Sequence, residues 1–380
     1  MLFINEKIVF KKFLSQNSYF FLLTSLSFTF IVWAIKAVRN LDIVSEDGHS
    51  FLIYFYYTFL MFPKIFGQIL PLIFFTSLFY SLIKYENNNE LKIFWINGIN
   101  KVNFYNVILR YTFLLFFLQI IITTILGPHM QNKARNYIKN STMDFFPSLF
   151  QEKKFIDTVD KLTIFIESKD RQGGLKNIYL KDDSTTYPRI IVAKSGQLIF
   201  ENDKRMLRLY NGKFINMDSD GKSSTFNFEK TDFNLSKFGT KTTTYRKLQE
   251  TSIIELLTCL NYIYIKKEIY VEKYLTCNKE SIDETVSEVY KRIFKPFYLF
   301  LLSSVVIFLV VSNHEKKGYT SFKFLIFSIG IFVIIISEIS VSFAGQSSLK
   351  FLISILSPLI IFLISYLFFY KRANYTNSKI

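Results

Sequence analysis

The stretch Phe351–Tyr370, near the carboxyl end of the chain, reads FLISILSPLIIFLISYLFFY and carries no charge over 20 residues. A helix of about 20 apolar residues is long enough to cross the hydrocarbon layer of a bilayer. Five other stretches have the same character: Phe13–Ile35, Ile65–Ile83 (preceded by the apolar Phe51–Phe62), Tyr111–Asn132, Pro296–His314 and Phe324–Phe343. The last of these contains one charge, Glu338. The sequence therefore predicts six membrane-spanning helices, three before residue 130 and three after residue 295.

The composition supports a membrane protein and excludes several other classes. Half of the 380 residues are hydrophobic, and 44 are Phe. The formal charge of +16 would suggest nucleic acid in a soluble domain, but here Lys and Arg flank the apolar runs and act as topology signals. The chain has no P-loop or hydrolase motif, and two Cys with three His argue against a zinc site. We expect no nucleic-acid partner, no catalytic residues, no metal and no cofactor.

The basic residues beside the spans predict the orientation, because short cytoplasmic loops are rich in Lys and Arg. Basic residues precede the first span, follow the last, and lie between spans two and three and between spans four and five. They are Lys7, Lys11, Lys12, Lys84, Lys92, Lys101, Lys316, Lys317, Lys323, Lys371 and Arg372. Both termini are then expected in the cytoplasm, and the region from about 130 to 285 on the opposite side.

This middle region has the sequence pattern of a β domain. Apolar and polar residues alternate in five stretches, which predict strands at Leu162–Glu167, Leu175–Lys181, Arg189–Phe200, Met206–Met217 and Ser224–Leu235. Turn residues accompany them, and Asn211-Gly212 is a typical hairpin signal. Two architectures fit the pattern: a plain sheet with one wet face, or a β-sandwich or jelly roll whose groove takes an apolar ligand.

The segment leading back to the membrane is predicted to be helical. Ser252-Ile-Ile-Glu255 and Ser281-Ile-Asp-Glu284 have the capping-box spacing. The second motif opens a helix in which Glu288 and Arg292 are spaced for an i,i+4 ion pair.

The two cysteines, Cys259 and Cys277, both fall in this segment. A disulfide is chemically permitted there, but lone thiols in an apolar helical region are usually packed, so the sequence favours packed thiols.

Several stretches resemble the LptF/LptG family of lipopolysaccharide export permeases. The matching stretches are PKIFGQILPL at Pro63–Leu72, Asn89-Glu90-Leu91 with Gly98 and Asn100, Gly127-Pro128, TIFIESKD at Thr163–Asp170, IIVAKSGQL at Ile190–Leu198 and EVYKRI at Glu288–Ile293. They resemble the family's second span, its cytoplasmic coupling helix, the end of span three, two stretches of LptF and the opening of span four. Asn89 and Asn100 stand where the family usually has Ser. The two LptF-like stretches favour LptF over LptG.

The resemblance implies an α-helical membrane protein with six transmembrane helices in two groups of three and an inserted periplasmic β-sandwich or jelly-roll domain. The expected divisions are 1–130, with a coupling helix at about 86–100, then 131–285 and 286–380. The implied role is that of an ABC transporter permease, not an enzyme, in the inner membrane of a Gram-negative bacterium. It would extract lipopolysaccharide from that membrane and pass it to a periplasmic bridge. The implied partners are the paralogous permease LptG, an LptB ATPase dimer, LptC and an LptA-type bridge.

The resemblance also assigns a substrate-binding role to three charged residues. Lys36 and Arg39, one turn apart near the outer end of span one, are expected to contact lipopolysaccharide phosphates, although flanking basic residues also snorkel to the interface. Glu338 lies about 22 Å along a helix from Lys323, in the outer half of span five. It is expected either to line a lateral gate and pair with Lys36 or Arg39, or to be an interfacial residue on a span that ends early.

Glu90 is expected to face the ATPase and to transmit its motion, with Lys84 and Lys92 joining that contact. The simpler alternatives are a solvated carboxylate at a helix start and positive-inside anchoring by the two lysines.

Two other functions compete with transport. One is a membrane-anchored receptor or assembly scaffold that uses its β domain, and the other is a membrane enzyme acting on lipid, for which no constellation of catalytic residues is evident.

Overall fold

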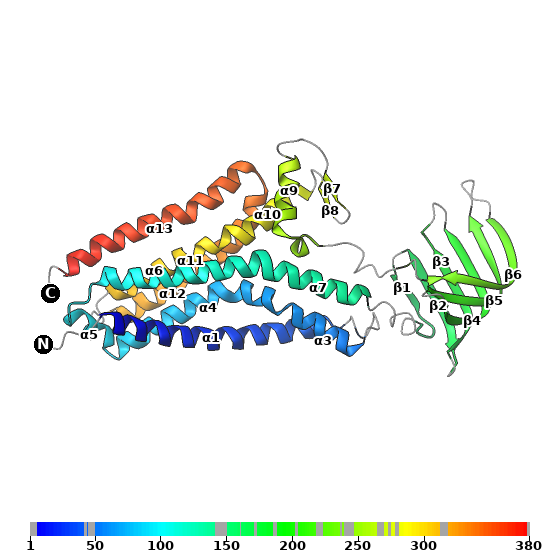
Figure 1. The fold of residues 1–380 in the computed structure, drawn as a ribbon, viewed down its shortest axis with the longest axis horizontal. Coiled ribbons are helices and arrows are strands. Elements are labelled where there is room, and N and C mark those ends of the chain that lie inside the picture. Colours follow the sequence, from blue (N-terminus) through cyan, green and yellow to red (C-terminus); the bar gives the residue numbers. More distant parts are fainter. Residues whose placement is uncertain are drawn as a thin grey trace. The chain divides into compact units, whose positions relative to one another are not determined.

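The computed structural model describes residues 6–41, 44, 50–140, 150–159, 161–170, 173–184, 188–201, 204–217, 223–235, 238, 247–263, 270–272, 275–277, 281–311 and 318–377 (Figure 1). The chain divides into two compact units. The helical unit comprises Met1–Ile35, Met61–Asn132 and Lys247–Ile380, and the β unit comprises Lys36–Leu60 and Lys133–Arg246. The topology residues Lys316 and Lys317 lie outside the described residues, as does the stretch Asp218-Ser-Asp-Gly221, whose residue types predict a turn.

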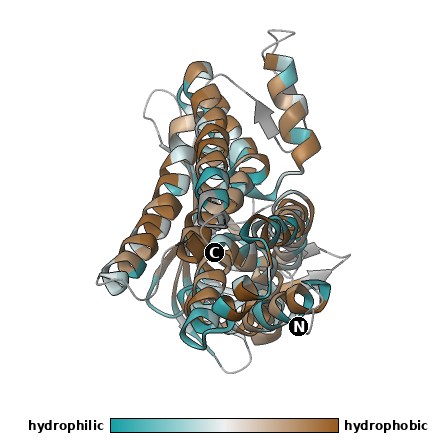
Figure 2. Ribbon diagram, turned by 90° about the vertical axis from the view of Figure 1, so that its left-hand side faces the viewer, coloured by the Kyte–Doolittle hydropathy of each residue, from teal (hydrophilic) through white to brown (hydrophobic). Residues whose placement is uncertain are grey.

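Six helical stretches in the described chain are long and apolar enough to cross a membrane, which confirms the prediction from the uncharged runs. The first three are α1 (Glu6–Arg39), α3 (Phe51–Leu60) with α4 (Phe62–Asn87), and α6 (Lys101–Ile121) with η1 (Ile122–Leu126) and α7 (Gly127–Asn140). The last three are α10 (Ile282–Ile293) with η6 (Lys295–Phe297), α11 (Tyr298–Ile307) and η7 (Phe308–Val311), then α12 (Tyr319–Gly345) and α13 (Ser348–Asn377). Figure 2 shows hydrophobic residues along most of their length.

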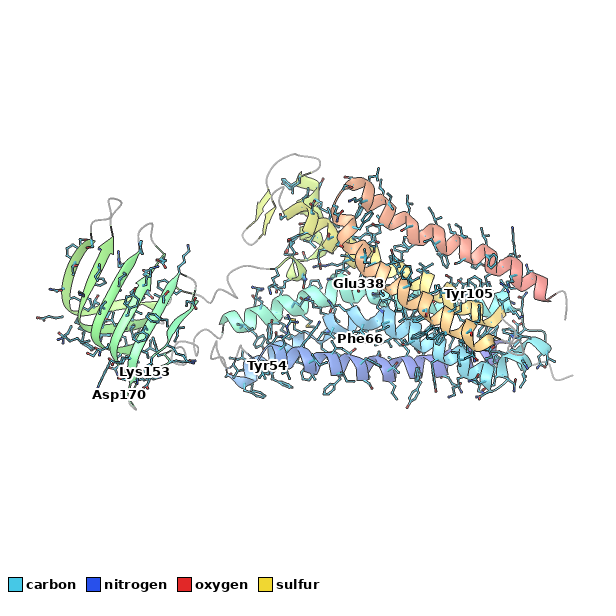
Figure 3. The ribbon with its side chains drawn as sticks, turned by 180° about the vertical axis from the view of Figure 1, so that it is seen from behind. Tyr54, Phe66, Tyr105, Lys153, Asp170 and Glu338 are labelled. Carbon is cyan, nitrogen blue, oxygen red and sulfur yellow. The ribbon has the colours of Figure 1, made fainter. Side chains whose placement is uncertain are left out.

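The helical unit is built around α11. This helix packs against α4, α6, α12 and α13, and eight of its ten residues are buried. A helix that is apolar on every side belongs in a protein interior. Its neighbours contribute large rings: Tyr105 of α6 (Figure 3) packs edge-on against Phe369 of α13, with ring centroids 4.9 Å apart.

Helix α1 buries a single stripe. Its buried residues follow one another at intervals of four: Val9, Phe13, Asn17, Phe21, Ser25 and Thr29. The stripe includes a polar contact between helices, in which Asn17 Oδ1 accepts hydrogen bonds from Ser77 (3.3 Å) and Ser81 (2.9 Å) of α4. Such bonds hold helices together where no water competes. The remaining faces of α1 are apolar and exposed, as expected for contact with lipid or with another membrane protein.

Helix α6 continues into α7 through η1, one turn of π-helix. Gly67 of α4 lies against this turn: a Cβ atom at residue 67 would sit 2.9 Å from Ile122 Cγ2. The close approach explains the glycine within the family-like stretch PKIFGQILPL. Insertions of this kind into α-helices are frequent at functional sites.

The β unit contains one six-stranded antiparallel sheet whose strands follow chain order. They are β1 (Phe155–Val159), β2 (Leu162–Lys169), β3 (Gly174–Asp182), β4 (Arg189–Glu201), β5 (Lys204–Met217) and β6 (Ser223–Asn234). All five predicted strands are present, and β1 is an addition. Figure 1 shows the sheet strongly curved. Among the described strands, β6 pairs with β5 alone and is therefore an edge.

The predicted Asn211-Gly212 hairpin is wrong. Both residues lie inside β5, where Gly212 is paired with Ala193 of β4 and Phe228 of β6. Asn211 has φ 52°, and Asn177 of β3 has φ 49°, so both adopt a left-handed conformation within a strand. Asn tolerates this region better than other side chains do. The Asn-Gly pair correctly indicates a residue with positive φ, but that residue lies at an irregularity within strand β5 and not at a turn.

At each of these two residues, the side chains that face the core change from odd-numbered to even-numbered positions. The pairing register with the neighbouring strands stays the same. In β3, Ile178 and Leu180, which follow Asn177, are even-numbered, whereas Leu175, which precedes it, is odd-numbered. All three side chains are buried. One face of the sheet therefore stays apolar along its whole length. Its buried core comprises Phe150, Ile156, Leu162, Ile164, Ile166, Leu175, Ile178, Leu180, Ile191, Ala193, Leu207, Leu209 and Leu235.

An ion pair ties the two outermost strands on one side of the sheet. Arg208 of β5 donates two hydrogen bonds to Asp232 of β6, at 2.8 and 2.9 Å. The hydrogen bonds from this guanidinium lower the pKa of the Asp232 carboxyl below its usual value.

The segment returning to the helices contains η3 (Leu248–Glu250), α9 (Ile253–Asn261) and a two-stranded sheet of β7 (Tyr270–Glu272) and β8 (Leu275–Cys277). Ser252 and Glu255 form the predicted capping box. Ser281 stands before α10 as predicted, but its side chain makes no capping hydrogen bond.

The prediction of packed thiols is wrong for Cys259. This residue is fully buried and disulfide-bonded, and no described cysteine is free. A covalent link constrains the unfolded chain, which packing of a thiol does not. The sequence contains only one other cysteine, Cys277.

We predict that Gly212→Val destabilises the β unit by about 1–3 kcal/mol, because overpacking forces neighbouring groups apart. A Cβ atom at residue 212 would lie 2.4 Å from both the Phe228 ring and the Val192 carbonyl oxygen. Limited proteolysis of the purified protein measures the effect, as faster cleavage within residues 150–235. Lys213→Val, at the exposed neighbouring position, is the control and should leave the rate unchanged; equal rates for the two variants would contradict the prediction.

Candidate functional site

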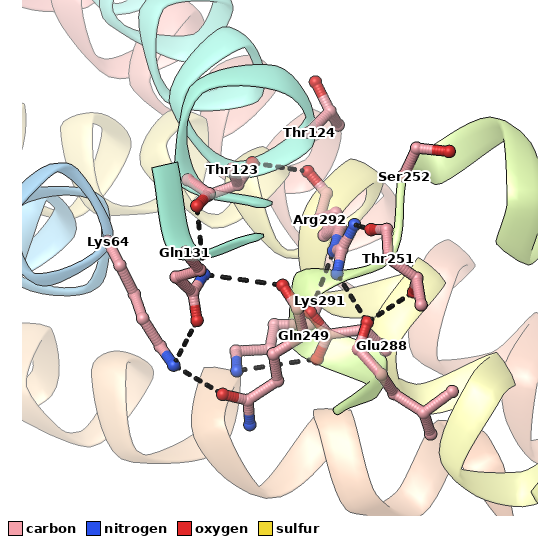
Figure 4. Close-up of polar contacts among 12 residues, drawn as sticks. Lys64, Thr123, Thr124, Gln131, Gln249, Thr251, Ser252, Glu288, Lys291 and Arg292 are labelled. Carbon is pink, nitrogen blue, oxygen red and sulfur yellow. Dashed lines mark hydrogen bonds and ion pairs between the residues drawn. The ribbon is translucent and has the colours of Figure 1, made fainter. Parts of the chain in front are cut away.

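The most connected polar group of the helical unit lies where α4, α7, η3 and α10 meet (Figure 4). We call it the polar joint and define it as Lys64, Gln131, Gln249, Glu288 and Arg292. Lys64 Nζ donates hydrogen bonds to Gln131 Oε1 at 2.8 Å and to Gln249 Oε1 at 2.5 Å. Gln131 Nε2 in turn lies 3.4 Å from the carbonyl oxygen of Gln249. One ammonium thus links three segments that are far apart in sequence.

Arg292 is the buried centre of the joint, with a side chain only 2% exposed. Its Nε donates to Glu288 Oε1 at 2.8 Å, the i,i+4 pair that the sequence predicts. Its two terminal nitrogens donate to the carbonyl oxygens of Thr251 (2.8 Å) and Leu248 (3.0 Å). A buried guanidinium needs both a counter-charge and acceptors for its remaining donors, and Arg292 has them. The residue therefore fastens the returning segment to the start of α10.

The joint also includes the π-helical turn. Thr123 Oγ1 of η1 lies 3.0 Å from the carbonyl oxygen of Arg292. A cavity of about 50 Å³ lies among these residues, lined by Lys64, Gln68, Ile122, Thr123, Gly127, Pro128, Gln131, Gln249, Glu288, Lys291 and Arg292. A space of this size has room for a few waters and none for a lipid chain. The arrangement is that of a mechanical connection and not of a substrate pocket.

Glu338 of α12 (Figure 3) is ion-paired with Lys295 of η6, at 2.5 Å. The sequence offered Lys36 or Arg39 as its partner, so the pairing with Lys295 was not foreseen. The two side chains differ sharply in exposure, with Lys295 8% exposed and Glu338 61% exposed. Helix α12 continues to Gly345, so Glu338 does not stand at the end of its span. It presents a carboxylate on an otherwise apolar helix face.

Lys36 and Arg39 occupy the last turn of α1. Lys36 is partly buried and Arg39 is exposed. Both belong to the β unit, together with Tyr54 of α3, whose hydroxyl donates to the Ala37 carbonyl oxygen at 2.7 Å. That bond holds α3 against the end of α1, which fixes the turn that carries the two basic residues.

The opposite ends of α4 and α6 are joined by the short helix α5 (Glu90–Ile96). Two left-handed residues bracket it, Asn89 with φ 58° and Gly98 with φ 80°. Asn100 then caps α6, its side chain accepting a hydrogen bond from the Val102 amide at 2.8 Å. Asn and Ser are nearly equivalent at such a cap, which explains why Asn can replace the family's usual Ser at residue 100.

Glu90 begins α5 and is paired with Lys12 of α1, at 3.6 Å. Lys84 is exposed and Lys92 is partly buried. The inward side of α5 buries Leu91 and Phe94.

The outward side of α5 is apolar. Ile96 is 75% exposed, and Ile93 is also exposed. An exposed apolar surface on a short helix at the end of a bundle is typical of a protein contact.

Comparison with known families decides what these features belong to. The model of the lipopolysaccharide export system permease family LptF/LptG matches residues 11–372, nearly the whole chain. The chain belongs to the LptF/LptG family. It is therefore a permease subunit of an ABC transporter for lipopolysaccharide export, as the resemblance implied. No curated protein sequence gives a significant match.

Within the LptF/LptG chain, sequence reasoning missed most of the polar joint. The family-like stretch EVYKRI marked Glu288 and Arg292, but nothing in it indicated that Arg292 is buried or that it binds carbonyl groups. Lys64 was visible only as the one charge that interrupts the second apolar run. Gln131 and Gln249 carried no signal, because amide side chains have no spacing rule that joins residues 118 positions apart. In the described chain, no group of three or more His, Cys, Asp or Glu is placed to hold a metal.

We predict that Arg292→Met loosens the returning segment, because Glu288 and two carbonyl groups then lose their donor. Breaking a buried ion pair by removing one partner costs about 3–5 kcal/mol. Hydrogen exchange of the purified LptF/LptG chain should rise across Leu248–Asn261, and the temperature of unfolding should fall.

The matched control is Lys291→Met, since Lys291 contacts the same carboxylate, at 3.7 Å, from a more exposed position. The Lys291 contact is long and its ammonium reaches solvent, so its loss should cost about 0–1 kcal/mol, as for pairs near the surface. Exchange should therefore stay near that of the unmodified chain. Equal exchange in the two variants would show that Arg292 does not hold the segment.

Proposed function

We propose that this chain is the LptF-type half of a permease heterodimer that takes lipopolysaccharide from the outer leaflet of the inner membrane and passes it to a periplasmic bridge. The family match over residues 11–372 is the observation that carries the proposal. The LptF-like stretches favour this half over LptG, and both lie in strands of the sheet: Thr163–Asp170 in and just after β2, and Ile190–Leu198 in β4.

The proposed orientation puts α5 and both termini in the cytoplasm and residues 131–285 in the periplasm. The basic residues at the α5 end of the helices support it, among them Lys12, Lys84 and Lys323. In this orientation the polar joint, Lys295 and Glu338 lie near the outer surface of the membrane, because Glu338 stands 19 residues from the start of α12 at Tyr319, about 28 Å of helix.

The proposed contact with lipopolysaccharide phosphates uses Arg39 and Lys36. Arg39 is exposed in the last turn of α1, and its planar guanidinium suits a phosphate group. The exposed apolar faces of the same helix suit the acyl chains, with Leu22, Leu26 and Phe30 among their residues. One helix thus offers both kinds of surface that an anionic lipid requires.

Glu338 is proposed to lie at a contact between the two permease halves. A carboxylate that is 61% exposed on a membrane helix is costly in lipid. Its ion pair with Lys295 leaves one side of the group facing outward. Basic residues at the end of the partner's first span, the counterparts of Lys36 and Arg39, would balance it.

The β unit is proposed to receive the acyl chains on its apolar face and to continue into the bridge at its edge. The apolar face runs along all six strands. The outer edge of β6 pairs with no other described strand, and such an edge accepts a further strand. LptC and an LptA-type protein are the partners proposed to extend the sheet.

Helix α5 is proposed to dock on the LptB ATPase dimer. Ile93 and Ile96 provide an apolar surface, and Glu90 a carboxylate at its first turn. Lys84 and Lys92 flank this surface. Because Leu91 and Phe94 anchor the other side of α5 in the bundle, a push on α5 reaches α4 and α6 directly.

We predict that Arg39→Asp lowers the yield of photo-cross-linking between lipopolysaccharide and a probe at Ile35, an exposed position one turn away. Reversing the charge repels the phosphates that the guanidinium would hold. The measurement uses the assembled complex in membranes, with unchanged assembly checked by co-purification of LptB. Arg39→Lys is the control and should retain most of the cross-linking; a full yield with Arg39→Asp would exclude the head-group contact.

We predict that Glu90→Ala weakens co-purification with LptB or the stimulation of its ATPase activity. The matched control is Lys12→Ala, which removes the same 3.6 Å ion pair but keeps the carboxylate. If Glu90 acts on the ATPase, only its own substitution lowers coupling. Equal losses in both variants would assign Glu90 a role within the permease alone.

A further inference from the structure

The face of the sheet opposite its apolar core carries a hollow that lies outside the surfaces proposed above for acyl chains and for the ATPase. The hollow has a volume of about 480 Å³ and extends across strands β2 to β6. Its lining residues are Phe165, Asn177, Ile178, Tyr179, Val192, Ala193, Lys194, Asn211, Gly212, Lys213 and Asn227. With strands about 4.8 Å apart, five strands give it a length of about 19 Å.

One wall of the hollow is a row of residues paired across the strands. The pairs are Phe165 with Tyr179, Tyr179 with Val192, Val192 with Lys213, and Lys213 with Asn227. Phe155 of β1 extends the row: it pairs with Phe165, with ring centroids 4.6 Å apart, and is 68% exposed. The row is aromatic at one end and polar at the other.

The second wall is formed by Asn177, Lys194 and Asn211. Each follows or precedes a paired residue of its strand: Ile178 pairs with Ala193, and Ala193 pairs with Gly212. The left-handed conformations of Asn177 and Asn211 belong to this wall. Ala193 and Gly212 also line the hollow, between the two walls. Ala193 belongs to the buried core on the other face, so it offers backbone to the floor. The irregular backbone and the two walls together make a trough that runs across the strands.

The chemistry of the trough is that of a saccharide site. Aromatic rings offer flat apolar surfaces on which the C–H faces of sugar rings stack, and Asn carboxamides both donate to and accept from hydroxyl groups.

The charge of the trough selects among saccharides. Its lining contains two lysines and no carboxylate, which gives it a charge of +2. Three acids, Glu167, Glu229 and Asp232, lie on the strands at its ends but outside the lining. Glu167 accepts a hydrogen bond from Asn177, and Asp232 is paired with Arg208. The ligand is therefore expected to be anionic. A protein strand is a poorer fit, because the trough lies on a face of the sheet and offers no free backbone edge.

We propose that this trough binds a linear anionic saccharide, with Tyr179 and Phe165 stacking on sugar rings and Lys194 and Lys213 holding carboxylate or phosphate groups. The proposal goes beyond lipopolysaccharide export and does not depend on it for the binding itself. Two sources supply such a ligand in the proposed periplasmic location: the phosphorylated sugar portion of lipopolysaccharide and the glycan strands of the cell wall.

Fluorescence anisotropy with labelled saccharides tests the site, using the full-length chain purified with its partners. The probes are the delipidated oligosaccharide of lipopolysaccharide, soluble glycan strands from cell wall, and a neutral dextran oligomer. Saturable binding of either anionic probe, tighter than that of dextran and weakened by salt, is expected. The tighter of the two anionic probes identifies the source. Absence of saturable binding for both would overturn the proposal.

Two variants locate the binding. Tyr179→Ala and Lys194→Gln should each lower the affinity by about tenfold, the loss expected for one stacking or ionic contact. Tyr179→Phe keeps the ring and should retain most of the affinity, which separates loss of stacking from loss of folding. Lys181→Gln is the charge control, because it also removes one lysine from the sheet. Lys181 lies on β3, as Tyr179 does, but outside the lining of the trough. Unchanged affinity in both Tyr179→Ala and Lys194→Gln would overturn the proposal. A photo-cross-linking probe placed at residue 194 gives a second test, and capture of a protein alone, without saccharide, would also overturn it.

Discussion

A single guanidinium group holds the returning segment to the helices. The chain leaves the helical unit within α7 and returns through η3. Among the first residues back, Leu248 and Thr251 offer their carbonyl oxygens to Arg292. Backbone groups at such a crossing have no ladder of their own, so they must find partners elsewhere. Arg292 supplies a hydrogen-bond donor to each of the two carbonyl groups, and its ion pair with Glu288 orients the guanidinium. Lys64 adds α4 to the same connection through Gln249. Movement of the helices therefore reaches the returning segment through direct hydrogen bonds, with no flexible tether between.

The chain carries both apolar and charged surfaces, which in the proposed function serve the two halves of an amphipathic cargo. Helix α1 carries apolar faces along its length and basic residues in its last turn, and the β sheet is apolar on one face and polar on the other. A lipid with a charged head requires both kinds of surface throughout its path. In the proposed function, the buried stripe of α1 keeps that helix in place while its other faces stay available to lipid. The interhelical contact of Asn17 with Ser77 and Ser81 lies within this stripe.

The sequence was informative wherever a pattern is local. Six apolar runs predicted six spans and alternation predicted five strands, because hydrophobic patterns depend only on neighbours along the chain. It failed where the partner is distant. Lys295 and Glu338 are 43 residues apart, and no local rule pairs them. The short strand β1, which follows two lysines, has too few alternating residues to stand out. Asn211-Gly212 carried a correct conformational signal, since Asn211 does adopt positive φ, but a turn and a strand irregularity demand the same residue types.

The roles of the charged residues could be suggested only by family resemblance. The roles proposed for Arg39, Lys36, Glu90, Lys84 and Lys92 depend on molecules outside the chain. The structure adds physical detail to each, such as the Lys12 partner of Glu90 and the exposed isoleucines beside it. The burial of Arg292 was suggested neither by family resemblance nor by the sequence. It results from tertiary packing, and an i,i+4 spacing carries no information about that packing.

The π-helical turn at Ile122–Leu126 sets the direction in which α7 faces. A π-turn contains one residue more than the α-turn it replaces, and each residue of an α-helix adds about 100° of rotation. Gln131 reaches Lys64 only because that extra residue has already turned the helix. If residues 122–126 formed ordinary α-helix instead, Gln131 would be turned by about 100° and would point away from Lys64. In this span, the width of one helical turn decides which residues meet in the polar joint.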